Sequence, residues 1–216
     1  MPFHHARWPA LLLAGALALP GCGGDRAGES AAPTNGAALA EDDTVCGTTE
    51  PPEGWTIPVV DAAGFDALRR QTAAEGKVLV VDVWATWCTS CVAMFPKLHA
   101  AMKDRGERVV AVSLCFDAGE EFVDKARAFL IKQQAWPTGY IADPEAKDAI
   151  AASISDAWSP GVLPAVFVFN TDGTLAHEML ETRGTVNDWV AEIGEAADAA
   201  LAAAPAQTSA RQGQQP

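Results

Sequence analysis

Two periods of hydrophobicity follow one another in the middle of this 216-residue chain. Residues Val78 to Trp84 form an apolar run, rich in β-branched side chains, that a single aspartate interrupts. Such a run is typical of a strand buried on both faces. From Val92 to Met102 the apolar residues instead recur at helical spacing. The pattern predicts a buried strand that leads through a short turn into an amphipathic helix.

Further elements alternate on either side of this pair. The expected strands are Ile57–Val60, Arg108–Leu114, Ala165–Asn170 and Thr174–Leu180, and the expected helices run from Asp61 to Gly76, Glu121 to Gln134, Pro144 to Ile154 and Thr185 to Leu201. A turn that ends in glycine, residues 170–173, joins the last two strands into a hairpin. This order predicts an α/β domain with a central mixed β-sheet flanked by helices on both faces.

The N-terminal end has the composition of a targeting segment. Residues 10–19 are apolar, follow Arg7 and are too few to span a bilayer, which needs about 20. They predict an export signal over residues 1–21. The four residues that end at Cys22, Leu-Pro-Gly-Cys, resemble a bacterial lipobox. Cys22 is therefore the expected lipidation site and membrane anchor, with secretion without a lipid as the alternative.

The domain lies between two polar segments. Residues 22–52 are rich in Gly, Ala, acidic residues and Pro and lack hydrophobic periodicity, so we expect a flexible tether. Residues 204–216 carry little apolar content and are expected to form a disordered tail. Residues 53–203 remain as one domain of about 150 residues, a size that buries a sound core.

The chain is acidic, with 15 Lys and Arg against 28 Asp and Glu and a net charge of −13. An acidic surface repels phosphate backbones, which argues against nucleic-acid binding. The charge either serves solubility alone or favours basic protein partners, and the sequence leaves both possibilities open.

Two cysteines, Cys88 and Cys91, fall in the turn between the buried strand and its helix. A thiol at a helix N-terminus feels the positive end of the helix dipole, which favours the nucleophilic thiolate. A second thiol one turn further can resolve a mixed disulfide. Half of a zinc site and an inert structural disulfide are the alternatives, but zinc needs two more ligands and the sequence offers no second pair of suitable spacing. The spacing predicts redox exchange without a metal or cofactor.

The residues around this pair resemble a known family. Residues 77–98, KVLVVDVWATWCTSCVAMFPKL, are similar to the active-site region of thioredoxin-like thiol:disulfide oxidoreductases, and residues 162–173, VLPAVFVFNTDG, are similar to their second signature. The chain most resembles the exported, membrane-anchored TlpA-like branch, which is associated with disulfide reduction and cytochrome c maturation. The resemblance implies a thioredoxin-like fold in which residues 118–159 form a central helical insertion.

The resemblance also implies roles for individual residues. Cys88, with an exposed sulfur at the helix start, is the expected nucleophile, and Cys91 is the resolving thiol. Trp87 is expected to offer an apolar docking surface. The bond between Leu163 and Pro164 is expected to be cis, in a loop that faces the nucleophile and whose Leu163 backbone contacts the substrate.

Asp82 is the polar exception in the buried strand. Burial without partners disfavours the charged carboxylate, so its pKa should be raised. The resemblance implies that Asp82 helps to deprotonate Cys91, and a purely structural, hydrogen-bonded aspartate is the alternative. The lysine partner of the family is absent from residues 109–118, and we expect His99 at the surface of its helix.

The remaining cysteines form an even pair. In an oxidising compartment, with Cys22 lipidated, we expect a structural disulfide between Cys46 and Cys115. In the alternative, Cys115 is a buried small hydrophobe and Cys46 is free.

Together these features predict an exported, lipid-anchored oxidoreductase, facing the periplasm or the cell exterior, that reduces protein disulfides as a monomer and is reloaded by a membrane electron donor. Thr89 and Ser90, between the cysteines, add no positive charge, which favours a reductant over a strong oxidant. Two alternatives stay open. One is the same chemistry run as a disulfide-forming oxidase, and the other is a non-enzymatic module that binds thiols or copper, with His177 as a candidate copper ligand.

Overall fold

The computed structural model describes residues 50–117, 119–180 and 183–204. The expected signal peptide, Cys22, Cys46, nearly all of the tether and the tail after residue 204 lie outside these residues. Across the described ranges, no helix combines the length and apolar character that crossing a bilayer requires.

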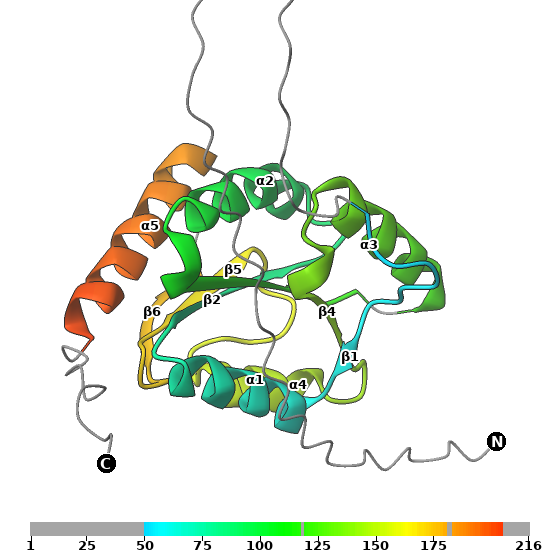
Figure 1. The fold of residues 1–216 in the computed structure, drawn as a ribbon. Helices are drawn as coiled ribbons and strands as arrows, with labels where there is room; N and C mark the ends of the chain where they lie inside the picture. Colours follow the sequence, from blue (N-terminus) through cyan, green and yellow to red (C-terminus); the bar gives the residue numbers. More distant parts are fainter. Residues whose placement is uncertain (1–49, 118, 181–182, 205–216) are drawn as a thin grey trace, which may run out of the picture. The chain divides into compact units, whose positions relative to one another are not determined.

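Within the described residues, six strands form one mixed sheet (Figure 1). The order across the sheet is β1-β4-β3-β2-β5-β6. The strands are β1 (Val59–Val60), β2 (Val78–Trp84), β3 (Val109–Cys115), β4 (Gly139–Ala142), β5 (Ala165–Phe169) and β6 (Leu175–Met179). The strands from β1 to β2 in this order are mutually parallel, whereas β5 runs antiparallel to β2 and β6 antiparallel to β5.

Helices cover both faces of this sheet, as the sequence predicts (Figure 1). One face carries α2 (Thr89–Lys103), α3 (Glu120–Lys132) and α5 (Val186–Ala203), and the other carries α1 (Ala62–Ala74) and α4 (Lys147–Ile154). Asp61 caps α1, as expected, and its side chain accepts a hydrogen bond from the Gly64 amide at 2.7 Å.

The strand β2 lies between the two apolar cores and has the predicted bounds. All seven of its residues are buried. Val78 and Val80 pack in the core beneath α2 and α5, whereas Leu79 and Val81 pack in the core beneath α1 and α4. Both faces of the strand are thus covered, which explains why its sequence is an apolar run and not an alternating one.

The strand β4 has no counterpart among the predicted strands. It lies between β1 and β3 and is parallel to both, so α3 is the crossover from β3 to β4. Residues 118–159 are therefore not simply a helical insertion. The strand is only four residues long and begins at Gly139, so its sequence carries little β-pattern. Gly139 is needed for packing, because a Cβ atom there would lie 2.6 Å from Leu130 Cδ1.

The antiparallel pairing of β2 with β5 brings two distant segments together at the end of the sheet where β2 ends and β5 begins. Val83, near the end of β2, is paired with Ala165 at the start of β5. The peptide bond between Leu163 and Pro164, directly before β5, is cis as predicted. The start of α2 and the loop before β5 consequently adjoin at this end.

Candidate active site

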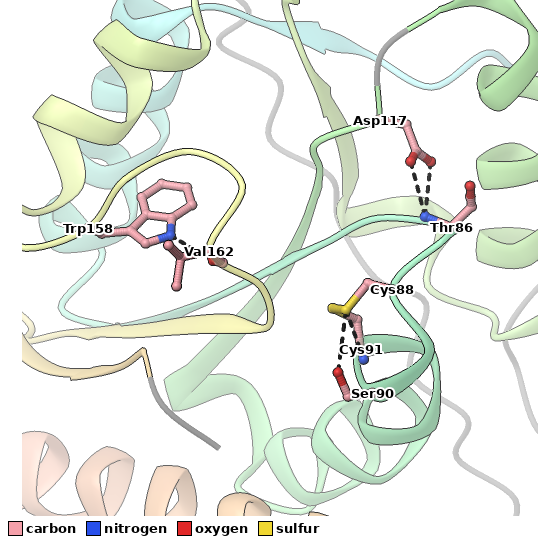
Figure 2. Close-up of a disulfide and its surroundings, with 7 residues drawn as sticks. All are labelled: Thr86, Cys88, Ser90, Cys91, Asp117, Trp158 and Val162. Atoms are coloured by element: carbon pink, nitrogen blue, oxygen red, sulfur yellow. Dashed lines mark hydrogen bonds between the residues drawn. A yellow bond between two sulfur atoms is a disulfide. The ribbon is translucent and has the colours of Figure 1, made fainter. Parts of the chain in front are cut away.

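Cys88 and Cys91 lie at the beginning of α2 and are joined by a disulfide (Figure 2). Their Cα atoms are 5.2 Å apart. Cys88 is the N-cap residue, and its Sγ accepts a hydrogen bond from the Cys91 amide at 3.2 Å. The Ser90 hydroxyl lies 3.5 Å from the same sulfur. After reduction, the helix dipole and this amide favour the thiolate of Cys88.

The two sulfurs differ in accessibility. Cys88 is 6% exposed, less than the sequence predicts, and Cys91 is 0% exposed. Of the two, only Cys88 keeps any accessible surface. Trp87, directly before it, is 58% exposed and presents a large apolar surface beside the sulfur. This asymmetry fits the predicted roles of attacking and resolving cysteine.

A buried carboxylate holds the turn that presents Cys88. Asp117 is 1% exposed, and the Thr86 amide donates to its two carboxylate oxygens at 3.2 and 3.0 Å (Figure 2). A charged acceptor strengthens such a hydrogen bond. The Phe116 amide also donates to the Trp84 carbonyl at 2.7 Å. The turn is thereby attached to the segment that follows β3.

Lys147 attaches α4 to the same segment. Its ammonium donates to the carbonyl oxygens of Phe116 and Asp117 at 2.6 and 3.0 Å. Partial burial lowers the pKa of Lys147, although the neighbouring Cys115 and Asp117 oppose this shift. The sequence gives no reason to single out Lys147 or Asp117, because each acts on residues about 30 positions away.

Cys115, at the end of β3, forms no disulfide in the structure. The residue is 0% exposed, and its thiol donates to Asp117 Oδ2 at 3.3 Å. Burial raises the pKa of this thiol, which makes it a poor nucleophile. In the structure Cys115 is thus a buried, free thiol, as in the alternative, and the expected disulfide to Cys46 stays a prediction. Cys46 itself lies outside the described residues.

The loop before β5 borders the cysteines. Leu163 packs against the apolar cluster that contains Cys88 and Cys91. The conformation of the loop is fixed by the indole nitrogen of Trp158, which donates to the Val162 carbonyl at 2.9 Å (Figure 2). This hydrogen bond ties the loop to Trp158, while Leu163 packs towards the cysteines.

Trp87 and Leu163, both expected at the substrate surface, line the same hollow. The hollow has a volume of ≈ 320 Å³ and is completed by Phe116, Phe122, Lys147, Pro160 and Gly161. Its walls are mainly apolar, and Lys147 is the charged residue among them. It offers a place for an apolar group beside Trp87, the residue directly before Cys88.

Asp82 is buried, with 1% of the residue exposed. Burial raises the pKa of its carboxyl, as predicted, and contact with His99 partly lowers it. The His99 Nε2 atom lies 3.5 Å from Asp82 Oδ2, and the His99 side chain is only 14% exposed. The surface position expected for His99 is therefore wrong. A signal was present in the sequence, because Cys91, Phe95 and His99 follow at four-residue intervals and so share one helix face.

The other candidate ligand, His177, is not part of this arrangement. Its Nε2 atom lies 2.9 Å from Glu192 Oε1 on α5, in an exposed pair. Throughout the ranges that the structure describes, no three His, Cys, Asp or Glu residues are grouped closely enough to hold a metal ion.

A comparison with known protein families agrees with this arrangement of strands, cysteine pair and cis-proline. Residues 56–193 match the Redoxin family. The chain belongs to the Redoxin family. Its mixed sheet, with a Cys pair at the start of α2 and a cis-proline before β5, is the thioredoxin-like fold.

Two curated relatives match shorter stretches of the chain. The thiol-disulfide oxidoreductase ResA of Oceanobacillus iheyensis is 44% identical over 54 residues, which cover 24% of this chain and 27% of ResA. A thioredoxin of Echinococcus granulosus is 40% identical over 70 residues, which cover 32% of this chain and 63% of that protein. The matched stretch spans less than two thirds of either relative.

Solved structures with a similar fold include two bacterial proteins. A thioredoxin-family thiol:disulfide interchange protein of Chlorobium tepidum is 18% identical with a TM-score of 0.47, over 69% of this chain and 99% of that one. A secreted disulfide oxidoreductase of Mycobacterium tuberculosis is 22% identical with a TM-score of 0.43, over 57% of this chain and 82% of that one. At such identities the likeness concerns the fold alone.

The raised pKa of Asp82 leads to a prediction about stability. In the folded protein Asp82 keeps its proton to a higher pH than in the unfolded chain. The stabilisation linked to this raised pKa is fully present below the pKa of the unfolded chain, and it is lost as the pH rises towards the pKa of the folded protein. Between these two pKa values the free energy of unfolding of the wild type should fall by up to about 1.4 kcal/mol per pH unit relative to that of Asp82→Asn, whose amide does not titrate. Asp82→Asn should therefore be the more stable protein near neutral pH, with a difference that shrinks in acid.

Urea unfolding at a series of pH values checks this expectation. Asp156→Asn, which removes an exposed carboxyl, is the matched control and should leave the wild-type curve unchanged. A difference between Asp82→Asn and wild type that does not vary with pH would contradict the burial effect.

Proposed function

We propose that this protein is an extracytoplasmic thiol:disulfide oxidoreductase that reduces disulfides in other proteins. The observation that carries the proposal is the Cys88–Cys91 disulfide at the start of α2, with Cys88 6% exposed and Cys91 fully buried. A joined pair of this kind is the oxidised product of dithiol exchange. Its position at a helix N-terminus favours the thiolate that such exchange requires.

The reaction follows from the difference between the two sulfurs. The Cys88 thiolate attacks one sulfur of a substrate disulfide, the substrate S–S bond breaks, and one substrate thiolate leaves. Cys91 then loses its proton, with Asp82 as the base, and attacks the Cys88 sulfur. The second substrate thiolate leaves, and two electrons have passed to the substrate. An external electron donor must reduce the Cys88–Cys91 bond before the next cycle.

The substrate surface is the apolar rim around Cys88. Trp87 and Val162 are 58% and 46% exposed, and Trp87 shares a hollow with Leu163. An extended substrate segment can lie along the loop before β5 and hydrogen-bond to the Leu163 backbone, as in β-strand addition. Main-chain recognition of this kind depends little on the amino-acid sequence of the substrate, which suits an enzyme with several protein substrates.

We assign the reducing direction from the residues between the cysteines. Strong disulfide oxidants stabilise the thiolate form by added positive charge, and Thr89 and Ser90 supply none. The Ser90 hydroxyl, 3.5 Å from Cys88 Sγ, contributes one weak polar contact. The competing proposal is the same exchange run as a disulfide-forming oxidase.

The site of action proposed here is the outer side of a membrane. The apolar segment at residues 10–19 and the lipobox-like sequence ending at Cys22 support an exported lipoprotein of the TlpA-like branch, with a membrane partner as electron donor. A lipid at Cys22 would keep the domain, through residues 23–52, within reach of that donor.

The assigned roles of the two cysteines lead to a prediction about turnover. The purified protein should accelerate the reduction of insulin by dithiothreitol, and Cys88→Ser should abolish this activity because it removes the attacking sulfur. Cys91→Ser should instead accumulate mixed disulfides with insulin, visible on non-reducing gels. Cys115→Ala is the matched control, since this thiol is buried and outside the pair, and it should keep the activity. Full activity in Cys88→Ser would overturn the assignment.

The reducing direction leads to a prediction about the redox potential. Equilibration of the Cys88–Cys91 pair with glutathione or dithiothreitol buffers should give a potential near that of thioredoxin, about −270 mV. A value near that of the oxidant DsbA, about −120 mV, would instead support the oxidase. Binding of copper by the reduced pair without disulfide exchange would support the non-enzymatic alternative.

The proposed anchor is tested in a bacterial host that processes lipoproteins. The wild-type protein should be recovered with the membrane fraction and Cys22→Ser should be released, because the serine cannot carry the lipid. Cys46→Ser, in the same region of the chain, is the matched control and should stay with the membranes. A wild type recovered wholly in the soluble fraction would show that the anchor does not form.

A further inference from the structure

We propose that His99 is the residue through which the buried Asp82 carboxyl exchanges its proton with solvent, and that His99 thereby sets the pH range in which Cys91 resolves the mixed disulfide. The inference rests on the dithiol exchange proposed above and concerns its second step. His99 acts through Asp82 and is a positioning residue, because it does not touch the reacting sulfurs.

The surroundings of Asp82 leave it dependent on His99. Its register partners on the neighbouring strands are Ser113 and Val166, whose side chains point to the same face of the sheet. Among the described residues, neither carboxylate oxygen of Asp82 has a hydrogen-bond partner of good geometry, and the same holds for Ser113 Oγ and His99 Nε2. The imidazole, 3.5 Å from Asp82 Oδ2, is the ionisable group that faces the carboxyl.

The ring of His99 is held in this orientation by stacking. Its plane lies 17° from that of Phe95, with the ring centroids 4.1 Å apart. Phe95 is itself 0% exposed and lies between His99 and Cys91 in the four-residue series along α2. Because His99 follows Cys91 by eight residues, the two lie about 12 Å apart along the helix axis. His99 therefore does not contact the Cys91 thiol and can act on it only through another group, for which the proposed base Asp82 is the candidate.

His99 also lines a surface hollow. This hollow has a volume of ≈ 420 Å³, and Pro96, Val109, Ala111, Gln134 and Thr138 line it together with His99. Lys103 is the one charged residue among the described residues that line it. His99 is thus placed between a buried acid and a hollow that water can enter. Asp82 has no comparable opening of its own, since it is 1% exposed.

The proton path balances with the exchange reaction. When Cys91 attacks Cys88, the Cys91 proton passes to the Asp82 carboxylate, and the substrate thiolate leaves. Asp82 is then a neutral acid and must lose this proton before it can act again. The imidazole accepts it at Nε2 and releases a proton from Nδ1 to water in the hollow. No electrons move in this step, and no additional reactant is needed.

The sign of the effect follows from the charges that face the carboxyl. Burial raises the pKa of Asp82, and His99 partly offsets this rise. Loss of the imidazole should therefore raise the pKa of Asp82 further, so that the carboxylate is available as a base only at higher pH. Lys103, from the same helix, lines the hollow, while the lining residues from β3 and from residues 133–138 are neutral.

The experiment separates the two thiol steps with an aromatic disulfide whose released thiolate absorbs visible light. Reduced protein releases one equivalent when Cys88 attacks and a second when Cys91 resolves, and both rates are followed by stopped flow across pH. His99→Phe keeps the stacking on Phe95. In this variant the acidic limb of the pH profile of the second rate should move up by about one pH unit. At a fixed pH on that limb, the second rate should therefore be about tenfold lower than in the wild type. The first rate should not change.

Three further variants test the assignment. His99→Lys again places a hydrogen-bond donor beside the carboxyl and should return the limb towards the wild-type position. Lys103→Gln removes a cation from the same hollow without touching the imidazole and should leave the limb in place. In an Asp82→Asn background, His99→Phe should have no additional effect. If His99→Phe does not fold, His99→Gln takes its place, with circular dichroism as the check of folding.

The possible outcomes distinguish this inference from the proposed function. A wild type that releases no second equivalent would overturn dithiol exchange itself. A wild type that releases both equivalents, with His99→Phe and His99→Gln following the wild-type pH profile, would overturn the role of His99 alone. A slower second step without a shift of the limb would also count against it, since that result indicates misplaced packing.

Discussion

The position of β2 in the sheet is the constraint on which the rest of the structure depends. This strand pairs with β3 on one side and with β5 on the other, and helices cover both of its faces. Its parallel pairing aligns Trp84 with Cys115, and its antiparallel pairing aligns Val83 with Ala165. The Cys turn, the segment that carries Asp117 and the cis-proline loop therefore meet at one edge. A shift of either register by one residue would separate them.

The burial that orders the site also carries a free-energy cost at one of its residues. Asp82 is on a strand that is buried along its whole length, where a charged carboxyl is unfavourable, and among the described residues the ionisable group beside it is His99. A hydrophobic residue there would pack without this penalty. The presence of a carboxyl between apolar neighbours is accordingly easier to explain by proton transfer than by stability. Asp117 differs, because its carboxylate accepts hydrogen bonds from Thr86 and stabilises the turn.

Features set by local sequence could be predicted, and features set by pairing of distant segments could not. The bounds of β2 and the cap at Asp61 follow from patterns within a few residues. The contact between Asp117 and Thr86 spans 31 positions and depends on the order of the strands. The four-residue β4 is defined by its neighbours more than by its own sequence. His99 lies between these two cases. Its position on the same helix face as Cys91 can be predicted from the spacing, but its contact with the Asp82 carboxyl cannot.

The exposed rim of the site has a consequence for the behaviour of the protein in concentrated solution. Trp87 and Val162 keep 58% and 46% of their surface exposed to water, as the docking surface proposed above requires. Apolar surface of this kind promotes self-association when two copies meet. A net charge of −13 opposes such encounters by long-range repulsion. The acidic composition thus opposes self-association through this rim, and added salt, which screens the repulsion, should promote it.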